Sequence, residues 1–222
     1  MSEGTRLTRA AIAGRMRSCG GGTLAGMAGP VAFTAAWIVA SLRQPGYSRT
    51  EIQISGLAAP GARDPWIMVT GFLVLGGSLV AFGPALRKGL GGSRRAGLSP
   101  WLIEAAGVLV IAAGLLRRDQ MLLTPGPGSW HNQAHDAVSA AIYALLIGIP
   151  LVLARRLHRD PDWRGLAVPV AASAIAAAAI LVVFSTADPN SPQAGALQRA
   201  GATIPLAALV ALAARLRRLS ST

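Results

Sequence analysis

Six long apolar runs, separated by charged or turn-rich connectors, dominate this sequence of 222 residues. A helix needs about 20 mostly apolar residues to span the hydrocarbon core of a bilayer, with a range of roughly 17 to 25. The runs that meet or nearly meet this length cover approximately residues 21–42, 66–86, 101–116, 137–154, 166–184 and 200–216. Leu98 and Pro100 extend the third run, which is short. We therefore predict an all-α, polytopic membrane protein that folds as a bundle of six transmembrane helices.

The composition favours a membrane protein over a nucleic-acid-binding protein. Charged residues make up 14% of the chain, whereas soluble domains carry about 25%. The formal net charge of +12 could attract nucleic acid, but nearly all charges lie at the ends of apolar runs, where arginines contact lipid headgroups. We therefore expect membrane lipid and no nucleic acid as a partner, with a protein partner or a homo-oligomer left open. Cys19 is the one cysteine, which excludes an internal disulfide.

The positive charges also predict the orientation, because arginine and lysine are retained on the cytoplasmic side of a membrane. One set of connectors and tails carries fifteen of them: Arg6, Arg9, Arg15, Arg17, Arg87, Lys88, Arg94, Arg95, Arg155, Arg156, Arg159, Arg164, Arg215, Arg217 and Arg218. The other set carries six: Arg43, Arg49, Arg63, Arg117, Arg118 and Arg199. We therefore expect both termini in the cytoplasm and the protein in the cell (inner) membrane. An even number of spans agrees with this orientation.

The domain organisation follows from the same pattern. We expect a basic cytoplasmic N-terminal tail over residues 1–20, one six-helix transmembrane domain over 21–218, and a short C-terminal tail over 219–222. The first apolar run is longer than the 7–15 residues typical of the apolar part of a signal peptide. We therefore expect an uncleaved signal anchor there.

The polar residues that do not set the topology concentrate in the outer connectors. Those of the first are Tyr47, Ser48, Glu51, Ser55 and Asp64. Those of the second are Asp119, Trp130, His131, Asn132, His135 and Asp136. Those of the third are Asp188, Asn190, Gln198 and Arg199. Because three loops of a small bundle converge, we expect one outward-facing pocket with the candidate ligand-binding residues Tyr47, Ser48, Glu51, Asp119, His131, His135, Asp136 and Arg199; catalytic residues stay unknown.

The sharpest local pattern is HNQAHD at residues 131–136, where the fourth helix begins. The spacing i, i+4 places His131 and His135 on one helix face, as in sites where two imidazoles share a metal, and an acidic residue could complete such a site. The glutamate of the metalloprotease pattern HExxH is absent. The alternative is that Ser129 caps the helix while both histidines bond to loop carbonyls. We expect no cofactor, with a metal at these two histidines as the alternative.

Two charged residues in or beside apolar runs are further candidates for a role beyond topology. Glu104 is about one turn inside the third run, and an intramembrane carboxylate marks a polar path or an ion pair. We expect that it reaches the headgroups or pairs with Arg94 or Arg95, unless it marks such a path. Arg199 opens the sixth run, where it could hold an anionic headgroup. The preferred alternative is an ion pair with one of three acids, Asp119, Asp136 or Asp188.

Four stretches together resemble a known family. They are GYSRTEIQISGLAAPGARDP at 46–65, GLLRRD at 114–119, SWHNQAHD at 129–136 and GALQRAG at 195–201. Their order and spacing are similar to those of the bacterial and archaeal membrane family called domain of unknown function 998, over roughly residues 20–218. The resemblance implies a multi-pass membrane protein, and it brings no mechanism. It also implies outer-face polar positions at Tyr47, Ser48, Ser55, Asp119, His135, Gln198 and Arg199.

Three functions are compatible with these features. The first is an integral membrane protein whose outer polar cluster binds a lipid or a small ligand, which requires no catalytic motif. The second is a membrane-embedded enzyme that acts on a lipid or isoprenoid at the outer leaflet, with His131 or His135 as base or metal ligand and an aspartate as partner. The third is a small transporter in which Glu104 and the outer acids mark a path.

The predicted orientation can be tested by labelling intact cells with a membrane-impermeant maleimide. In a Cys19→Ser background, we expect labelling of His131→Cys, in an outer connector, and none of Gly91→Cys, in a cytoplasmic one. Labelling of both positions after the cells are permeabilised is the control. The reverse pattern in intact cells would reject the orientation.

Overall fold

The computed structural model describes residues 20–122, 128–186 and 191–221, and within these ranges all regular secondary structure is helical. The long helices are α2 (Gly20–Arg43), α3 (Pro65–Gly89), α5 (Ser99–Leu115), α6 (Trp130–His158), α7 (Ala167–Thr186) and α8 (Ala194–Ser221). The short ones are η1 (Ile54–Ala58), α4 (Ser93–Ala96) and η2 (Arg164–Leu166). The predicted basic tail falls almost entirely outside the described residues.

Five of the long helices have the length and composition to cross a membrane: α2, α3, α6, α7 and α8. The apolar helix α5 is shorter, with 17 residues. Large apolar side chains such as Val31, Val168 and Ile175 are exposed on the outside of the bundle, as expected where lipid is the solvent. The protein is therefore an all-α, multi-pass membrane protein.

Two helices begin well before the apolar runs that predicted them. The helix α6 begins at Trp130, before the run over 137–154, because the Ser129 side chain accepts a hydrogen bond from the backbone N–H of Asn132 and caps the helix there. The helix α8 begins at Ala194, before the run over 200–216, and continues to Ser221 through most of the expected tail. Hydropathy detects the part of a helix in hydrocarbon and misses the polar turns at either end.

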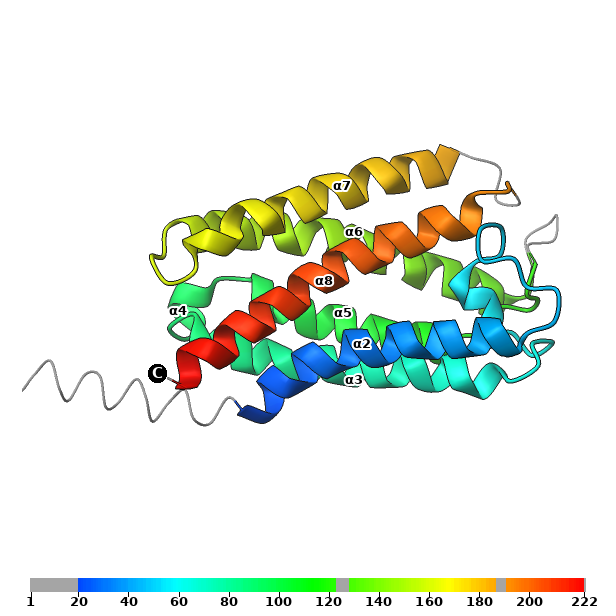
Figure 1. The fold of residues 1–222 in the computed structure, drawn as a ribbon, viewed down its shortest axis with the longest axis horizontal. Coiled ribbons are helices and arrows are strands. Elements are labelled where there is room, and N and C mark those ends of the chain that lie inside the picture. The colour runs from blue at the N-terminus through cyan, green and yellow to red at the C-terminus, as the bar shows by residue number, and fades with distance from the viewer. Residues whose placement is uncertain (1–19, 123–127, 187–190, 222) are drawn as a thin grey trace, which may run out of the picture.

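The contacts among the six long helices form a closed ring. Each packs on the next along the chain, and α8 returns to pack on α2. The start of α2 and the end of α8 lie at one end of the bundle, together with α4 and η2 (Figure 1); we call this the α4 end. The opposite end holds η1, the ends of α5 and α7, and the starts of α6 and α8; we call it the η1 end. The described parts of all three expected outer loops therefore converge.

The helices α3 and α5 touch through backbone. A Cβ atom added to Gly76 would lie 2.5 Å from the carbonyl oxygen of Gly107, and one added to Gly107 would lie 2.6 Å from that of Gly76. Such close approach is typical of membrane helices, which associate largely through van der Waals packing of small residues. This contact brings α3 and α5 together beside the centre of the ring.

The Gly76–Gly107 contact predicts different outcomes for two adjacent substitutions. Gly76→Ala places a methyl group against the α5 backbone and should lower the free energy of unfolding by about 1–3 kcal/mol. Gly77→Ala meets nothing within 4 Å, so it should leave stability unchanged or raise it slightly through helix propensity. Thermal unfolding in detergent, followed by tryptophan fluorescence, measures both. Equal unfolding midpoints would contradict the close contact.

Candidate ligand-binding site

Arg199, in the second turn of α8, fastens the first outer loop to the bundle. Its Nη1 donates to the carbonyl oxygens of Arg49 at 2.6 Å, Ile52 at 2.9 Å and Gly195 at 2.8 Å, and its Nη2 donates to the hydroxyl of Tyr47. Burial raises the pKa of Tyr47, although the nearby Arg199 opposes the shift. The neutral tyrosine can therefore donate its own proton onward to the Ile52 carbonyl, at 3.0 Å.

The ion pair expected for Arg199 with Asp119 or Asp136 is not formed; the third expected partner, Asp188, lies outside the described residues. The physical reason is the irregular backbone of the first loop, whose carbonyl groups need donors once they are buried. A planar guanidinium carries five N–H donors and no acceptor, so one side chain can satisfy several carbonyls at once. Arg199 acts here as a clamp on the backbone.

Asp119 fixes the start of α6. Its carboxylate accepts hydrogen bonds from the Ser129 backbone N–H at 2.7 Å and from the Ser129 hydroxyl at 2.5 Å. These two bonds lower the pKa of Asp119, so the carboxylate stays charged beside the positive N-terminal end of a helix dipole. Asp119 is exposed and lines neither of the cavities described below. Asp119 therefore holds Ser129, the N-cap residue of α6, in place.

His135 caps the C-terminal end of α5. Its Nδ1 lies 3.0 Å from the carbonyl oxygen of Ala113 and 2.7 Å from that of Leu116. The last carbonyls of a helix have no partner within the helix, so the buried imidazole satisfies two of them. Because both partners are acceptors, Nδ1 must carry the proton, and Nε2 of the neutral ring is then an acceptor. The predicted Ser129 cap is confirmed. His135 bonds to carbonyls as predicted, although these end α5 rather than lie in a loop, and the carbonyl bond predicted for His131 is not formed within the described residues.

His131 takes no part in this arrangement. It is exposed, and its ring stacks on Trp130 with centroids 3.7 Å apart. Within the residues that the structure describes, no three histidine, cysteine, aspartate or glutamate side chains lie close enough together to hold a metal ion.

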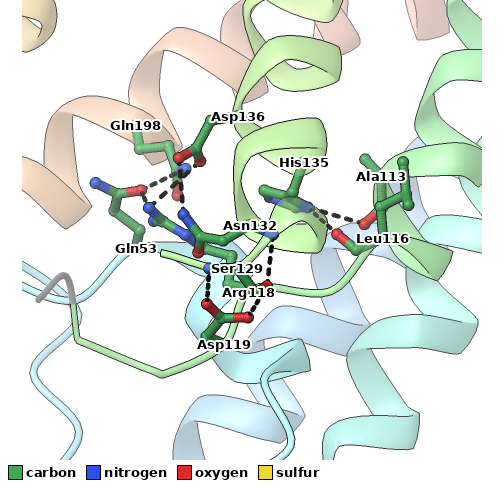
Figure 2. A network of polar contacts seen from close by, with 10 residues as sticks. All are labelled: Gln53, Ala113, Leu116, Arg118, Asp119, Ser129, Asn132, His135, Asp136 and Gln198. Carbon is green, nitrogen blue, oxygen red and sulfur yellow. Dashed lines mark hydrogen bonds and ion pairs between the residues drawn. The ribbon is translucent and has the colours of Figure 1, made fainter. Parts of the chain in front are cut away.

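Arg118 is the most buried charged residue described at the η1 end, with 5% of its surface exposed. Its Nη1 donates to Oε1 of Gln53 at 2.9 Å, and its Nη2 lies 3.4 Å from Oδ1 of Asp136 (Figure 2). Burial lowers the pKa of Arg118, and the carboxylate of Asp136 opposes the shift; an arginine remains charged in either case. The Nε atom is buried without a hydrogen-bond partner.

Two adjoining cavities meet at this network. The first, of about 70 Å³, lies at the centre of the ring and is mostly apolar; we call it the inner cavity. The second, of about 540 Å³, lies at the η1 end and reaches α7; we call it the outer cavity. The lining shared by both is polar and defines what we call the polar belt: Ser55, His135, Ser139, Tyr143 and Gln198.

The belt is assembled from three parts of the chain. His135, Ser139 and Tyr143 succeed one another at intervals of four residues along α6, which places them on one helix face. Gln198, from α8, accepts a hydrogen bond from the Ile54 backbone N–H at 2.6 Å and so joins η1 to the belt. The arrangement offers hydroxyl, amide and imidazole groups to an occupant, with apolar surface on either side.

The residues predicted from sequence thus divide into groups. His135 and Asp136 line the outer cavity. Tyr47, Asp119 and Arg199 hold its surrounding loops, and His131 is exposed. In the turn of the first loop, Ser48 Oγ accepts a bond from the Glu51 N–H at 3.3 Å, and the Glu51 side chain is exposed. The sequence analysis missed Ser139 and Tyr143, which the four-residue spacing from His135 could have revealed.

Glu104 lies away from both cavities, near the α4 end. Its Oε1 is 3.2 Å from Nη1 of Arg87, whose guanidinium also stacks on the ring of Trp101 at 3.6 Å. The ion pair is formed with Arg87; Arg94 takes no part in it, and the side chain of Arg95 lies outside the described part of the structure. The last turn of α3 faces the first turn of α5, and Gly83 leaves room there for the glutamate side chain.

The fold and the site define a class: a multi-pass helical membrane protein with an apolar inner cavity and a larger outer cavity that meet at the polar belt. Residues 27–215 match the family described as protein of unknown function (DUF998), and the chain belongs to that family. No curated protein and no solved structure matches the chain.

The two histidines of HNQAHD should respond differently to substitution. His135→Ala removes the donor for two buried carbonyl groups and leaves a cavity, and an unsatisfied buried polar group alone costs about 1–3 kcal/mol. His131→Ala removes an exposed ring and should change the unfolding midpoint little. Thermal unfolding of both variants in the same detergent measures the difference. A midpoint for His135→Ala equal to that for His131→Ala would contradict the role of His135 as a cap for α5.

Proposed function

We propose that this protein binds a single amphipathic lipid, with the polar group of the lipid at the polar belt and an apolar end in the inner cavity. The observation that carries the proposal is the position of the belt between an almost wholly apolar cavity and a larger, mixed one. A ligand with one polar group and apolar surface on both sides of it matches that order. A small polar solute would leave the inner cavity unfilled.

The charges at the belt favour a polar group without net charge. Arg118 and Asp136 lie next to each other, so their charges largely cancel, and the belt itself contributes hydroxyl, amide and neutral imidazole groups. Such groups bind hydroxyls, amides or a zwitterion. The unpartnered Nε of Arg118 is a buried donor, and an acceptor on the ligand would satisfy it.

The size of the inner cavity limits what it can hold. A volume of about 70 Å³ corresponds to roughly five to seven water-sized groups when one water needs about 10–15 Å³. The inner cavity therefore has room for a short apolar end of a ligand, on the scale of a few methylene groups. The longer part of a lipid would have to leave through the outer cavity.

For the membrane arrangement, we propose six spans, with α5 as the sixth, both termini in the cytoplasm, and the cell (inner) membrane as the location. A helix of 17 residues is about 25 Å long, close to the hydrocarbon thickness of about 30 Å. The α4 end carries most of the arginines of the connectors, which supports its placement in the cytoplasm. The η1 end and the outer cavity then face the outside.

A second candidate function is an enzyme that acts on the bound lipid. It is favoured by the orientation of His135, whose Nδ1–H is held by two carbonyls so that Nε2 is an acceptor, and by the Ser139 hydroxyl one turn away. A general base requires such a fixed ring. The two functions can be distinguished by mass spectrometry, because an enzyme would convert the bound lipid into a product of different mass. For transport there is less support, since Glu104 is paired with Arg87 at the opposite end.

Lipid analysis of protein extracted directly into nanodiscs tests the binding proposal. We expect the wild-type protein to retain lipid whose headgroup carries no net charge, enriched over the surrounding bilayer. Ala202→Phe places a ring in the inner cavity and should reduce the retained lipid by about tenfold, which corresponds to 1.4 kcal/mol. Ala211→Phe, at an exposed position on the same helix, is the matched control. Equal lipid retention in the two variants would reject the proposal.

A further inference from the structure

We infer that the ligand of this site is a lipid of the surrounding bilayer that reaches the polar belt sideways, between the η1-end halves of α6 and α7. The inference rests on the proposed lipid binding and adds the source of the ligand and its route. Three features support it: the lining of the outer cavity, the polar network on the side of that cavity toward water, and the difference in polar bonds between α7 and its neighbours α6 and α8.

The outer cavity lies between α6 and α7. Its lining comes from α6 at Asp136, Ser139, Ala140 and Tyr143 and from α7 at Leu181, Phe184 and Ser185. Ala140 and Ser185 line the cavity and are also exposed, so the cavity opens on their side. In Figure 1, α6 and α7 lie close together toward the α4 end and diverge toward the η1 end. The opening therefore faces the lipid beside the bundle.

A chain of polar contacts among the described residues crosses the side toward water. Arg118 bonds to Gln53 at 2.9 Å and pairs with Asp136 at 3.4 Å, and Nε2 of Gln198 donates to Oε1 of Gln53 at 3.4 Å (Figure 2). These residues join the first outer loop to α6 and α8. A solute arriving from water would have to break this network, whereas a lipid arriving between the helices would not.

The helix α7 is the wall with the fewest polar anchors. At the η1 end, α6 is held by Asp119 and by the His135 bonds, and α8 by Arg199 and Gln198. In the described part of the chain, by contrast, the hydroxyls of α7 bond only to carbonyls of α7 itself: those of Ser173, Ser185 and Thr186. Among the described residues, the η1 end of α7 is therefore held to its neighbours by apolar packing, and it can move aside at modest cost.

Movement of α7 would leave the rest of the site intact. The inner cavity is lined by α2, η1, α3, α5, α6 and α8, with no residue of α7. At the α4 end, the two helices border a shared groove at Ala154 on α6 and at Ala167 and Ala171 on α7. A displacement confined to the η1-end half of α7 would widen the outer cavity and leave the lining of the inner cavity in place.

A cross-link between α6 and α7 tests the route. In a Cys19→Ser background, Ala140→Cys with Leu181→Cys joins the helices at the outer cavity, and Ala154→Cys with Ala171→Cys joins the same helices at the α4 end as the matched control. The protein is reconstituted in vesicles of phosphatidylethanolamine with a minority of phosphatidylglycerol. The probe is phosphatidylethanolamine with a photoreactive diazirine in one acyl chain, and its adducts are mapped by mass spectrometry.

Without a cross-link, we expect adducts on residues of the two cavities. The cross-link at the outer cavity, made before the probe is added, should reduce these adducts by about tenfold; made after loading, it should retain the bound probe. The control cross-link should change neither result. Water-soluble glycerophosphoethanolamine, added in excess, should not compete. Leu181→Trp, which fills the opening without a cross-link, should also slow loading, compared with Val168→Trp at an exposed position of α7.

The outcomes separate the two proposals. Equal loading with and without the outer cross-link, or competition by the soluble headgroup, would overturn the sideways route and leave lipid binding standing. The absence of cavity adducts in the protein without cross-links would reject lipid binding itself.

Discussion

The hydrogen bonds that buried side chains donate to backbone carbonyls determine the structure of the η1 end. In a bilayer no water is available to satisfy irregular backbone, so such carbonyls need donors from the protein. His135 supplies one N–H to two carbonyls that end α5, and Arg199 supplies its guanidinium to three carbonyls around the first outer loop. Through these bonds the loop is held close over the bundle, and Gln198, the neighbour of Arg199, reaches the centre of the ring. The cavity thus depends on the same short segment that anchors the loop.

The polar belt follows from this anchoring. With α8 fixed by Arg199 and α6 fixed by Asp119 and His135, the side chains of Gln198, Ser139 and Tyr143 face a common space. The charged residues near it are paired, since Arg118 lies against Asp136, which leaves an uncharged set of donors and acceptors. A site of this kind would discriminate by the placement of hydrogen bonds more than by charge, which is why we propose a net-neutral polar group as its ligand.

The sequence predicts the helices well and the site in part. The apolar runs identify every long helix, because lipid imposes a length that hydropathy detects, but they miss the capped and polar turns that begin α6 and α8. The segment HNQAHD marks the right place, yet only His135 of its two histidines is buried. Carbonyl partners leave no signature in sequence, so the role of Arg199 could not be located, and the carbonyls that His135 binds proved to lie at the end of α5 rather than in a loop. Arg118 opposes the cytoplasmic bias of positive charge, which indicates acids or lipid phosphate nearby, but its burial beside Gln53 arises from a contact 65 residues apart.

The unequal anchoring of the helices connects stability with access. A bundle that binds a ligand inside must exclude bulk lipid from its centre and still admit one ligand molecule. If all helices were held equally firmly, the bundle would exclude lipid but could not admit the ligand. Here the backbone contact of Gly76 with Gly107 tightens α3 against α5, and polar clamps fix α6 and α8. The helix α7, which has neither kind of contact among the described residues, borders the outer cavity but not the inner one. Outward movement of α7 would expose only the outer cavity. The free energy of this opening would depend on the apolar contacts that α7 loses, and each loss costs little because lipid tails replace the lost contact.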